Sequence, residues 1–503
     1  YEMQRSLVGS EMCIRDSSDR RLKVGKSYFL VYPGGLVMEL DWNQKNVLVI
    51  GAGISGFAAA KLARRFGATV TLSDAKMEEE LTKLGDDFAK LRELGIALAF
   101  GPQQESLLEG VDTVIVSPAV PVRIPLIQAA YKKGIRVMSE VELAYDIAES
   151  PICAVTGTNG KTTTTTLLGL LLETHYDKVG VGGNIGVPLS EEALRIGKGG
   201  CIAAEISSYQ MEATEHFHPH VAAVLNVTPD HIVRHGSMEV YQAMKERLFR
   251  EETEDDYLVL NYDDEKTRGM KARTAAQVCY FSRREELEEG VFVRGSVRDG
   301  LIVIRWQGQE YELCHTDELG IKGPHNVENA LAAIAEAFFA GCEPALMVPV
   351  LKSFRGVEHR IEYVTTIDGV PYYNDSKATN TDSAIKALET FDGHIILLAG
   401  GDDKMTDLTD FMKLVCERVD SLILIGRAAA RFYGAAVDNG FPENQIYAAG
   451  YSMRKAVEIA HALAKEPAVV LLSPACASFD MYHNMAERGR DFKHLVHELE
   501  QQK

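Results

Sequence analysis

Residues 152–162 read Ile152-Cys-Ala-Val-Thr-Gly-Thr-Asn-Gly-Lys-Thr162, an apolar run that leads into a glycine-rich loop ending in Lys-Thr. The run predicts a buried strand, and the leucine-rich segment that begins near Thr162 predicts a helix. Such a loop surrounds phosphates with backbone N–H groups, while its lysine reaches the β- and γ-phosphates and its threonine binds Mg²⁺. Val155 stands where the common P-loop has its first glycine, so we interpret this segment as a variant ATP-binding loop.

Two similar transitions from strand to loop lie on either side of this one. Val47–Ile50 leads into Gly51-Ala-Gly-Ile-Ser-Gly56, and Ile395–Leu398 leads into Ala399-Gly-Gly-Asp-Asp-Lys404. Apolar runs alternate with helical stretches from Val47 to the end, which is typical of α/β domains with parallel sheets. We predict an α/β protein of three domains: a Rossmann-like N-terminal domain, a central P-loop-type ATPase domain with a mixed or parallel sheet, and a Rossmann-like C-terminal domain.

The length of 503 residues also favours about three domains, because a single hydrophobic core seldom grows beyond ~250–300 residues. Turn-forming stretches suggest boundaries that place the domains at residues 38–149, 150–355 and 356–503. Within the central domain, Val291–Glu312 alternates polar and apolar residues and predicts a small β-meander. Residues 1–37 mix charges and turn formers, and we expect them to be an artefact of gene assembly or a disordered extension.

Charge and composition exclude several classes of protein. Lys and Arg number 53 against 72 Asp and Glu, a net charge of −19, and a uniformly acidic chain repels nucleic-acid phosphates. No run of 18 apolar residues occurs, so we expect no membrane insertion. The eight cysteines never approach C-x-x-C spacing, which argues against a zinc site or a disulfide framework and suits a reducing cytoplasm.

The first loop has more than one chemical interpretation. Its glycines, Gly51, Gly53 and Gly56, satisfy G-x-G-x-x-G, and Asp74 follows the next predicted strand, Thr69–Leu72. This pattern indicates NAD binding, with the acid on a ribose hydroxyl. The same device can hold any other nucleotide diphosphate, and the glycines can also serve only the close packing of strand and helix.

Two candidate metal ligands follow later strands. Glu205 ends one apolar run, and His231 follows the buried run Val221–Leu225 after a Thr-Pro-Asp turn. Because the carboxyl ends of parallel strands line the ligand crevice, we expect both side chains near the ATP loop, where they could hold Mg²⁺. Lys245 lies on the predicted helix Met238–Phe249, and its position alone favours an exposed helical lysine over a functional one.

Seven motifs occur together in the order that is found in the Mur ligases, and over about residues 45–500 the chain resembles that family. They are Gly157–Thr162, Gly183-Asn-Ile-Gly186, Glu205-Ile-Ser-Ser208, Asn226-Val-Thr-Pro-Asp-His231, Gly323-Pro-His-Asn326, His359-Arg360 and Asn374-Asp-Ser-Lys377. The chain is most similar to the members that add D-glutamate, and it lacks the Asp-Asn-Pro-Arg signature of diaminopimelate-adding relatives. The closest cues are the Gly51–Gly56 loop, Asp375–Asn380, Gly400–Lys404 and Leu472–Ser478.

The resemblance implies an ATP-dependent ligation in cell-wall precursor synthesis in the bacterial cytoplasm, carried out by a monomer. The carboxylate of UDP-N-acetylmuramoyl-L-alanine would attack the γ-phosphate of ATP, and the amine of D-glutamate would displace phosphate from the acyl phosphate. The first step brings two anions together, so lysines and two Mg²⁺ ions must neutralise the developing charge.

The resemblance also implies catalytic and metal-binding roles for single residues. The catalytic residues would be Lys161, His231, Lys377 and Lys245, the last as a carbamylated lysine. The Mg²⁺ ligands would be Thr162, Glu205, His231 and carbamylated Lys245.

Three further groups would contact the substrates. ATP would be bound by Gly157, Thr158, Asn159, Gly160, Lys161, Thr162, Thr163, Asn326, Asn329, Arg360 and Asp375, with His359 at the domain hinge. The UDP substrate would be bound by Gly53, Ser55, Gly56, Asp74, Ser117, Asn184 and His231. D-glutamate would be bound by Thr379, Lys404 and Ser478.

Three alternatives remain open. Another Mur-type or folylpolyglutamate-type ligase would use the same acyl-phosphate mechanism but would join a different pair of substrates. An NAD-dependent oxidoreductase would use the Gly51–Gly56 loop but leave the Lys161 loop unexplained. A non-catalytic nucleotide-binding regulator would have no use for Lys161, Glu205 and His231 together.

Overall fold

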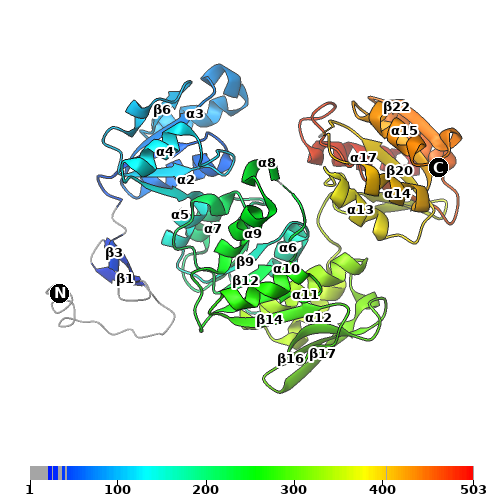
Figure 1. Cartoon of the computed structure of the whole chain (residues 1–503), viewed down its shortest axis with the longest axis horizontal. Coiled ribbons are helices and arrows are strands. Elements are labelled where there is room, and N and C mark those ends of the chain that lie inside the picture. Colours follow the sequence, from blue (N-terminus) through cyan, green and yellow to red (C-terminus); the bar gives the residue numbers. More distant parts are fainter. Residues whose placement is uncertain are drawn as a thin grey trace.

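Three α/β domains follow one another along the chain, which confirms the predicted fold class (Figure 1). The computed structural model describes residues 21–24, 27–31, 37–39, 42–230, 232–403 and 405–501. A small antiparallel sheet precedes the domains and consists of β1 (Arg21–Val24), β2 (Ser27–Val31) and β3 (Val37–Glu39). The rest of the predicted extension, residues 1–37, lies outside the described residues.

The N-terminal domain is a five-stranded parallel sheet in the order β6-β5-β4-β7-β8, with helices on both faces. The first strand, β4, lies in the middle, so the chain changes direction across the sheet next to it, which is where Rossmann-like folds bind ligands. The strands are β4 (Asn46–Ile50), β5 (Thr69–Asp74), β6 (Ala97–Phe100), β7 (Thr113–Val116) and β8 (Arg136–Ser139). The helices are α2 (Ile54–Arg65), α3 (Gly85–Glu93), α4 (Pro125–Lys132) and α5 (Glu140–Ile147).

The central domain contains a nine-stranded mixed sheet in the order β10-β11-β9-β12-β13-β14-β15-β16-β17. Its first seven strands are parallel, whereas the β15–β16 and β16–β17 pairs are antiparallel, so β16 runs opposite to the other strands of this sheet. The strands are β9 (Ile152–Thr156), β10 (Val179–Gly183), β11 (Cys201–Glu205), β12 (Val221–Val224), β13 (Tyr257–Asn261), β14 (Gln277–Ser282), β15 (Gly290–Arg294), β16 (Leu301–Trp306) and β17 (Gln309–His315). The helices are α6 (Lys161–Leu172), α7 (Leu189–Ile196), α8 (Ile232–His235), α9 (Met238–Glu246), α10 (Glu265–Arg268), α11 (Pro324–Phe339) and α12 (Pro344–Ser353).

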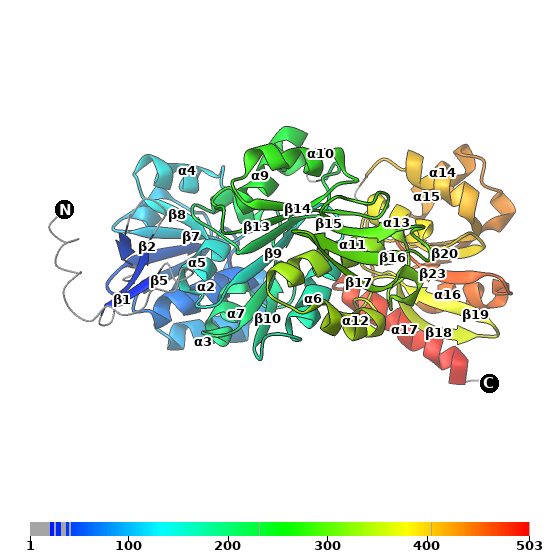
Figure 2. The same cartoon turned by 90° about the horizontal axis from the view of Figure 1, so that it is seen from below.

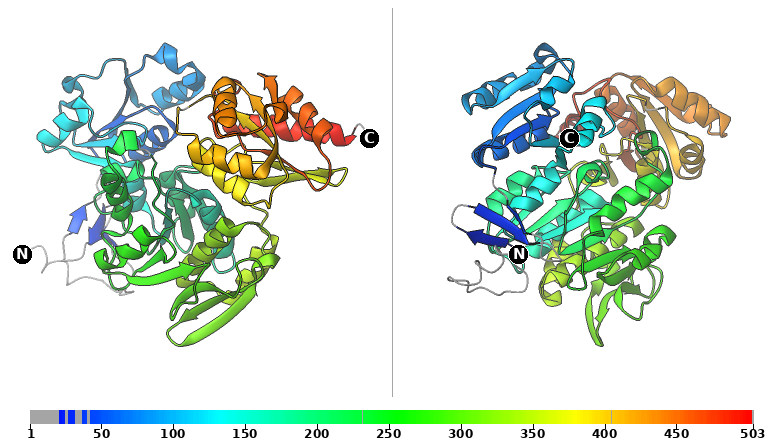
Figure 3. Two further views of the ribbon diagram at one scale, coloured as in Figure 1. Left: turned by 45° about the vertical axis from the view of Figure 1, so that its right-hand side comes forward. Right: turned by 60° about the vertical axis from the view of Figure 1, so that its left-hand side comes forward.

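The predicted β-meander over Val291–Glu312 is confirmed as β15, β16 and β17, which pair in antiparallel fashion. It is not a separate sheet, because β15 pairs with β14 and so extends the central sheet. The β16–β17 hairpin projects from the central domain, away from the other two domains (Figure 3).

All five residues of β9 are buried, because helices cover both faces of the sheet. Cys153 and Val155 face a core that contains the leucines of α6 and the alanines of α11. Ile152 and Ala154 point to the opposite face, where α5 and α7 cover them. Each fully buried leucine contributes about 1.5–3 kcal/mol to stability, so this packing fixes the position of the loop that joins β9 to α6.

The C-terminal domain has a six-stranded sheet in the order β18-β19-β23-β20-β21-β22, parallel except for the β18–β19 pair. The strands are β18 (Glu362–Ile367), β19 (Val370–Asn374), β20 (Ile395–Gly400), β21 (Val419–Ile425), β22 (Ile446–Gly450) and β23 (Val469–Leu472). The helices are α13 (Thr381–Glu389), α14 (Thr409–Arg418), α15 (Ala429–Asp438), α16 (Met453–Leu463) and α17 (Met485–Gln501).

Side-chain caps define where several helices begin. Ser139, Ser237, Asn380 and Ser452 each accept a hydrogen bond from the backbone N–H three residues later, at the starts of α5, α9, α13 and α16. Such caps satisfy one of the N–H groups that the first helical turn leaves unpaired. No helix of the described ranges is long and apolar enough to cross a membrane.

The central domain lies between the other two domains, which face it from opposite ends (Figure 2). Helix α5 joins the first two domains, since Val141 and Ala144 belong to the central core and Leu143 to the N-terminal core. The Glu142 carboxylate of the same helix accepts hydrogen bonds from three successive backbone N–H groups of the central domain, at residues 215–217.

Gly56→Ala tests whether the first glycine-rich loop requires close packing between helix and strand. A Cβ at Gly56 would lie 1.9 Å from the carbonyl oxygen of Gly51, so α2 would have to move away from β4. We expect a loss of about 1–3 kcal/mol in stability, as for other overpacked sites, measured by thermal unfolding. Gly53→Ala is the control, because its Cβ would meet only Ser117 Oγ at 3.8 Å; equal unfolding midpoints for the two variants would contradict the packing role.

Candidate active site

The loop between β9 and α6 needs glycine at two positions. Gly160 has φ +87° and Gly157 has φ +155°, both in the region that side chains disfavour. A Cβ at Gly160 would also lie 2.2 Å from the amide oxygen of Asn329 on α11. The loop therefore passes close under α11 and delivers Lys161 as the first residue of α6, where the unpaired N–H groups of the helix favour an anion.

Asn226, which follows β12, holds this loop in place. Its amide oxygen accepts from the backbone N–H groups of Thr158 at 3.1 Å and Asn159 at 2.8 Å. Its amide nitrogen donates to the Asn159 carbonyl at 3.1 Å. The hydroxyl of Thr158 also lies 3.1 Å from that of Tyr241 on α9. These bonds fix the loop conformation through side chains of two other elements.

Two lysines donate to one carbonyl of the loop. The Gly157 oxygen lies 2.8 Å from Lys161 Nζ and 2.7 Å from Lys245 Nζ. Lys245 is 1% exposed, and its ammonium lies 4.5 Å from the centre of the Tyr241 ring. Burial lowers the pKa of Lys245 well below its usual value, and the charge of Lys161 adds to this effect. Burial is also the main cause that lowers the pKa of Lys161.

Further cations arrive from the C-terminal domain. Lys377 Nζ donates to the hydroxyl of Thr162 at 2.9 Å, across the domain boundary. Burial, helped by repulsion from Arg360 and Lys161, lowers the pKa of Lys377 to about 8. Burial also lowers the pKa of Arg360. The site thus gathers positive charge from two domains, and a polyanion such as a triphosphate would neutralise it.

Glu205 supplies the negative charge of the site. It ends β11 and is 2% exposed. One carboxylate oxygen accepts from Asn184 Nδ2 at 2.7 Å, and the other has no hydrogen-bond partner among the described residues. A buried unpartnered carboxylate oxygen next to a phosphate loop suits a hard cation such as Mg²⁺. Asn184, which the resemblance assigns to the UDP substrate, therefore lies beside the predicted metal ligand.

Phosphate oxygens of the substrate would be further ligands of such an ion. Within the described ranges there is no group of three or more His, Cys, Asp or Glu side chains that could hold a metal. Mg²⁺ typically uses one or two protein carboxylates together with phosphate oxygens, and Glu205 with Thr162 fits that pattern. His231 and Lys404, which complete the predicted metal and D-glutamate sites, lie outside the described residues.

The predicted adenosine contacts form a chain of amides under the loop. Asn329 Nδ2 donates to Asn326 Oδ1 at 3.1 Å, and Asn326 Nδ2 donates to the Lys322 carbonyl at 2.8 Å. The hydroxyl of Thr164 donates to Asn329 Oδ1 at 3.4 Å. These contacts join α6 to α11, so both asparagines also have a structural role.

Asp375 supports the segment that carries Arg360. One of its carboxylate oxygens accepts from the Ser473 hydroxyl at 2.7 Å and the other from the Ile361 N–H at 3.2 Å. Burial raises the pKa of Asp375 to about 7, against the opposing effects of Ser473 and Arg360. The carboxyl group is thus engaged within its own domain.

The first glycine-rich loop lies at the carboxyl end of the N-terminal sheet, as predicted. Gly53 and Ser55 stand at the amino end of α2, and Ser117 follows β7 next to Gly51. Asp74 accepts from the N–H groups of Ala52 at 2.8 Å and Lys76 at 2.9 Å, so its carboxylate shapes the loop.

Thr379 and Ser478 belong to the corresponding edge of the C-terminal sheet. Thr379 follows β19 and Ser478 follows β23, and these two strands are parallel neighbours. Ser478 is 2% exposed, and its carbonyl accepts from the N–H groups of Met481 and Tyr482. Their strands therefore bring the two predicted D-glutamate ligands to one edge of the sheet.

Sequence reasoning missed three residues that organise the site. Tyr241 precedes Lys245 by one helical turn on the same face of α9, a spacing that could have indicated it. Asn226 could have been found from its position directly after a central strand. Arg234 donates to the Pro118 and Val120 carbonyls of the N-terminal domain and to both oxygens of Glu212. Its backbone acceptors leave no signal in the sequence.

Comparisons with known proteins assign this architecture. Residues 45–139 match the Mur ligase MurD-like N-terminal domain, residues 155–337 the Mur ligase middle domain, and residues 359–476 the Mur ligase glutamate ligase domain. Together the three matches cover most of the chain. The chain therefore belongs to the Mur ligase family, which explains why the first loop need not bind NAD.

Curated relatives are similar over nearly the whole chain. The UDP-N-acetylmuramoylalanine–D-glutamate ligase of Pelotomaculum thermopropionicum is 46% identical over 91% of this chain and 98% of its own length. The protein of the same name from Thermoanaerobacter pseudethanolicus is 43% identical over 92% of this chain and 100% of its own length.

Solved structures support the fold at lower identity. The UDP-N-acetylmuramate–alanine ligase of Thermotoga maritima has a TM-score of 0.56 and 21% identity, covering 92% of this chain and all of that one. A pseudomurein peptide ligase of Methanothermus fervidus has a TM-score of 0.54 and 19% identity over 91% of this chain and all of that one.

Asn226→Ala tests the support of the ATP loop. Removing the amide takes away the side-chain acceptor of the Asn159 N–H, whereas the Thr158 N–H keeps its bond to the backbone carbonyl of residue 226. Loss of a buried hydrogen-bond partner costs about 1–3 kcal/mol. We expect ATP affinity to fall by about tenfold or more, measured by calorimetric titration. Thr166→Ala on α6, whose hydroxyl bonds only the Thr162 carbonyl, should bind ATP normally; unchanged affinity in Asn226→Ala would contradict the assignment.

Proposed function

We propose that this chain catalyses the ATP-dependent addition of D-glutamate to UDP-N-acetylmuramoyl-L-alanine. Two relatives that carry the name of this ligase are 46% and 43% identical over more than nine tenths of the chain. The proposal rests mainly on the side chains that surround the loop between β9 and α6. Lys161 and Lys245 donate to the loop, Lys377 donates to Thr162 at its end, and Glu205 interacts electrostatically with Lys377. This cluster is what joining a carboxylate to a triphosphate requires.

ATP binds with its phosphates at the amino end of α6. The N–H groups of Lys161, Thr162 and Thr163 belong to the first helical turn and have no acceptor within the helix. Lys161 and Lys377 neutralise the β- and γ-phosphates. Gly157–Gly160 let the backbone approach the phosphates closely. The nucleoside part of ATP is contacted by Asn326, Asn329, Arg360 and Asp375.

Mg²⁺ is held by Thr162, Glu205 and His231. When bound, it neutralises charge on the phosphate oxygens and on the attacking carboxylate. Lys377 reaches the same place from the C-terminal domain, so the site is complete only when both domains meet. With the substrates bound, the site must also exclude water, which would otherwise hydrolyse an acyl phosphate.

The other two substrates approach from the outer domains. The UDP part binds at Gly53, Ser55 and Gly56, at the amino end of α2, with Asp74 and Ser117 beside it. D-glutamate binds at Thr379, Lys404 and Ser478, because an ammonium and hydroxyl groups are suitable donors for two carboxylates. Its amine attacks the acyl carbon, the tetrahedral intermediate collapses, and phosphate leaves.

Lys245 acts as a carbamate. Its buried amine has a strongly lowered pKa, so a neutral fraction is available to attack CO₂. The ammonium first loses one proton to solvent, and the neutral nitrogen then forms a bond to the carbon of CO₂ and loses a second proton. The two proton losses together replace a buried cation with an anion. That anion supports a second Mg²⁺ ion together with His231.

We further propose that the enzyme works as a monomer in the bacterial cytoplasm, with domains at residues 38–149, 150–355 and 356–503. The cysteines in the described ranges are free thiols, as is usual in a reducing compartment.

A substrate assay separates this ligase from other members of the family. With ATP, Mg²⁺ and UDP-N-acetylmuramoyl-L-alanine, we expect ADP release only when D-glutamate is present, measured by a coupled ADP assay. L-glutamate, L-alanine and diaminopimelate are the controls. ADP release of similar size with another amino acid, or with UDP-N-acetylmuramate and L-alanine, would contradict the proposed specificity.

Lys245→Ala tests the carbamate. We expect ligase activity to fall by at least about a hundredfold, consistent with losing a charge-stabilising group, and to recover in part with added acetate or propionate. Methylamine, which replaces an ammonium, should not restore it. Lys266→Ala removes an exposed lysine on α10 and should keep full activity. Full activity of Lys245→Ala, or rescue by the amine instead of the acids, would refute the carbamate.

A further inference from the structure

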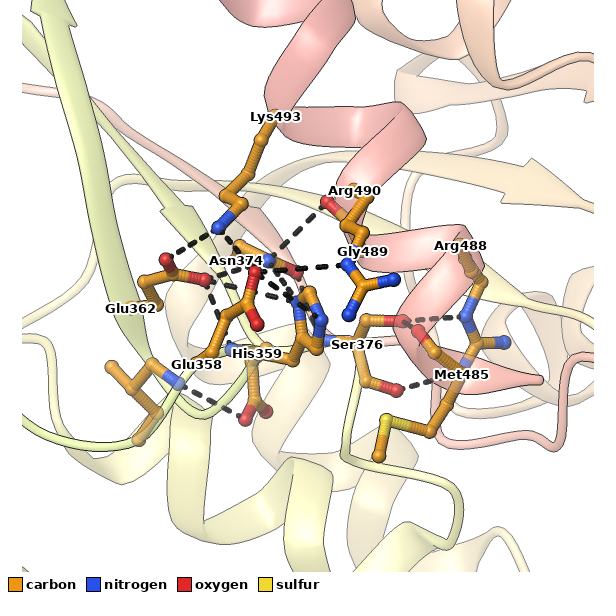
Figure 4. Close-up of polar contacts among 12 residues, drawn as sticks. Glu358, His359, Glu362, Asn374, Ser376, Met485, Arg488, Gly489, Arg490 and Lys493 are labelled. Atoms are coloured by element: carbon orange, nitrogen blue, oxygen red, sulfur yellow. Dashed lines mark hydrogen bonds and ion pairs between the residues drawn. The ribbon is translucent and has the colours of Figure 1, made fainter.

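Polar contacts surround the segment Glu358–Glu362 at the start of the C-terminal domain (Figure 4), and its backbone is unusual. His359 has φ +69° and Ile361 has φ +44°, so two non-glycine residues on either side of Arg360 are left-handed. Left-handed backbone is uncommon outside glycine and is a genuine outlier for a β-branched residue such as isoleucine. Such a turn persists only when the surrounding structure holds it.

Side chains of the C-terminal domain hold this turn. Glu362 Oε2 accepts from the backbone N–H of His359 at 2.9 Å and from Asn374 Nδ2 at 3.0 Å. Asn374 Nδ2 also lies 2.9 Å from Nδ1 of His359, a residue that is 3% exposed. Glu362 is therefore the acceptor that keeps the backbone of His359 in its left-handed conformation.

Lys493 on α17 joins the two ends of the turn. Its ammonium donates to Glu358 Oε1 and to Glu362 Oε1, both at 2.8 Å (Figure 4). The two carboxylates stand before and after the left-handed residues, so one cation bridges the whole turn. Arg490 lies 4.0 Å from Glu358, at the limit of an ion pair, and approaches only that one end.

The same turn positions two cations of the ATP site. Arg360 lies between its left-handed residues and interacts electrostatically with Asp375 and Glu205. The carbonyl of His359 accepts from the backbone N–H of Lys377 at 3.0 Å, and Lys377 Nζ reaches Thr162. A shift of the turn would therefore displace both Arg360 and Lys377 from the phosphate loop.

We propose that Lys493 is a positioning residue for ATP binding. It binds Glu358 and Glu362, holds the strained turn between them, and through that turn places Arg360 and Lys377 against the phosphates. Its ammonium contacts neither Lys161 nor Glu205 nor the loop itself. The inference rests on the ATP site of the proposed function, and it adds a residue on the last helix of the chain to that site's supports.

Lys493→Met tests the proposal, because methionine keeps much of the side-chain volume and removes the charge. We expect the Kd and KM for ATP to rise about fivefold to twentyfold, while KM for the UDP substrate stays unchanged. Lys493→Arg, which can still bridge two carboxylates, should restore most of the ATP affinity. Arg454→Met is the matched control. It removes an ion pair to Glu498, which lies on α17 like Lys493, and it leaves the contacts of the turn intact.

Two results with the single variants would overturn the proposal. One is an unchanged ATP affinity in Lys493→Met; the other is an equal loss of ATP affinity in Arg454→Met, which would indicate only a general loosening of α17. In a double-mutant cycle, Lys493→Met and Glu358→Gln should be strongly non-additive in ATP affinity, and additive effects would also contradict the bridge.

The proposed ligase activity can fail separately from this inference. Calorimetric ATP titration of the full-length protein needs no other substrate, so it tests Lys493 even if D-glutamate does not stimulate ADP release. Both proposals fall if the unmodified protein binds no ATP.

Discussion

The carbonyl oxygen of Gly157 accepts hydrogen bonds from two lysine ammonium groups, and the rest of the site depends on this arrangement. Burial lowers the pKa of both Lys161 and Lys245, because the charged form of each side chain loses solvation inside the protein. Lys377 and Arg360 add to this concentration of charge, within a chain whose net charge is −19. A site of this kind is stabilised by anionic ligands, and the proposed substrates are all anions.

Domain assembly is what brings these charges together. The loop and Lys245 come from the central domain, whereas Lys377 approaches from the C-terminal domain and bonds Thr162. On the other side, Arg234 connects the central domain to the loop after β7 of the N-terminal domain. Each outer domain thus contacts the central one through specific hydrogen bonds near the place where its own substrate would bind.

The sequence predicted the fold well because its strands are short, apolar and directly followed by glycine-rich loops. Ile152–Val155, Cys201–Ala204 and Val221–Leu225 all correspond to strands of the central sheet, in β9, β11 and β12. The predicted meander was also found, although its pairing with β14 was not foreseen. Tyr241 and Arg234 were missed because their partners, Thr158 and the carbonyls after β7, are far away in sequence.

By itself, the sequence determined the α/β class, the ATP loop and the family, because each rests on local patterns of glycine, lysine and alternating apolar residues. Only the tertiary structure decided which side chains meet. Glu205 gains a partner in Asn184 and keeps one oxygen unpartnered, and Lys493 bridges Glu358 and Glu362. Such contacts depend on the order of strands in the sheets and on how the domains pack, and neither is encoded in the local periodicity of the chain.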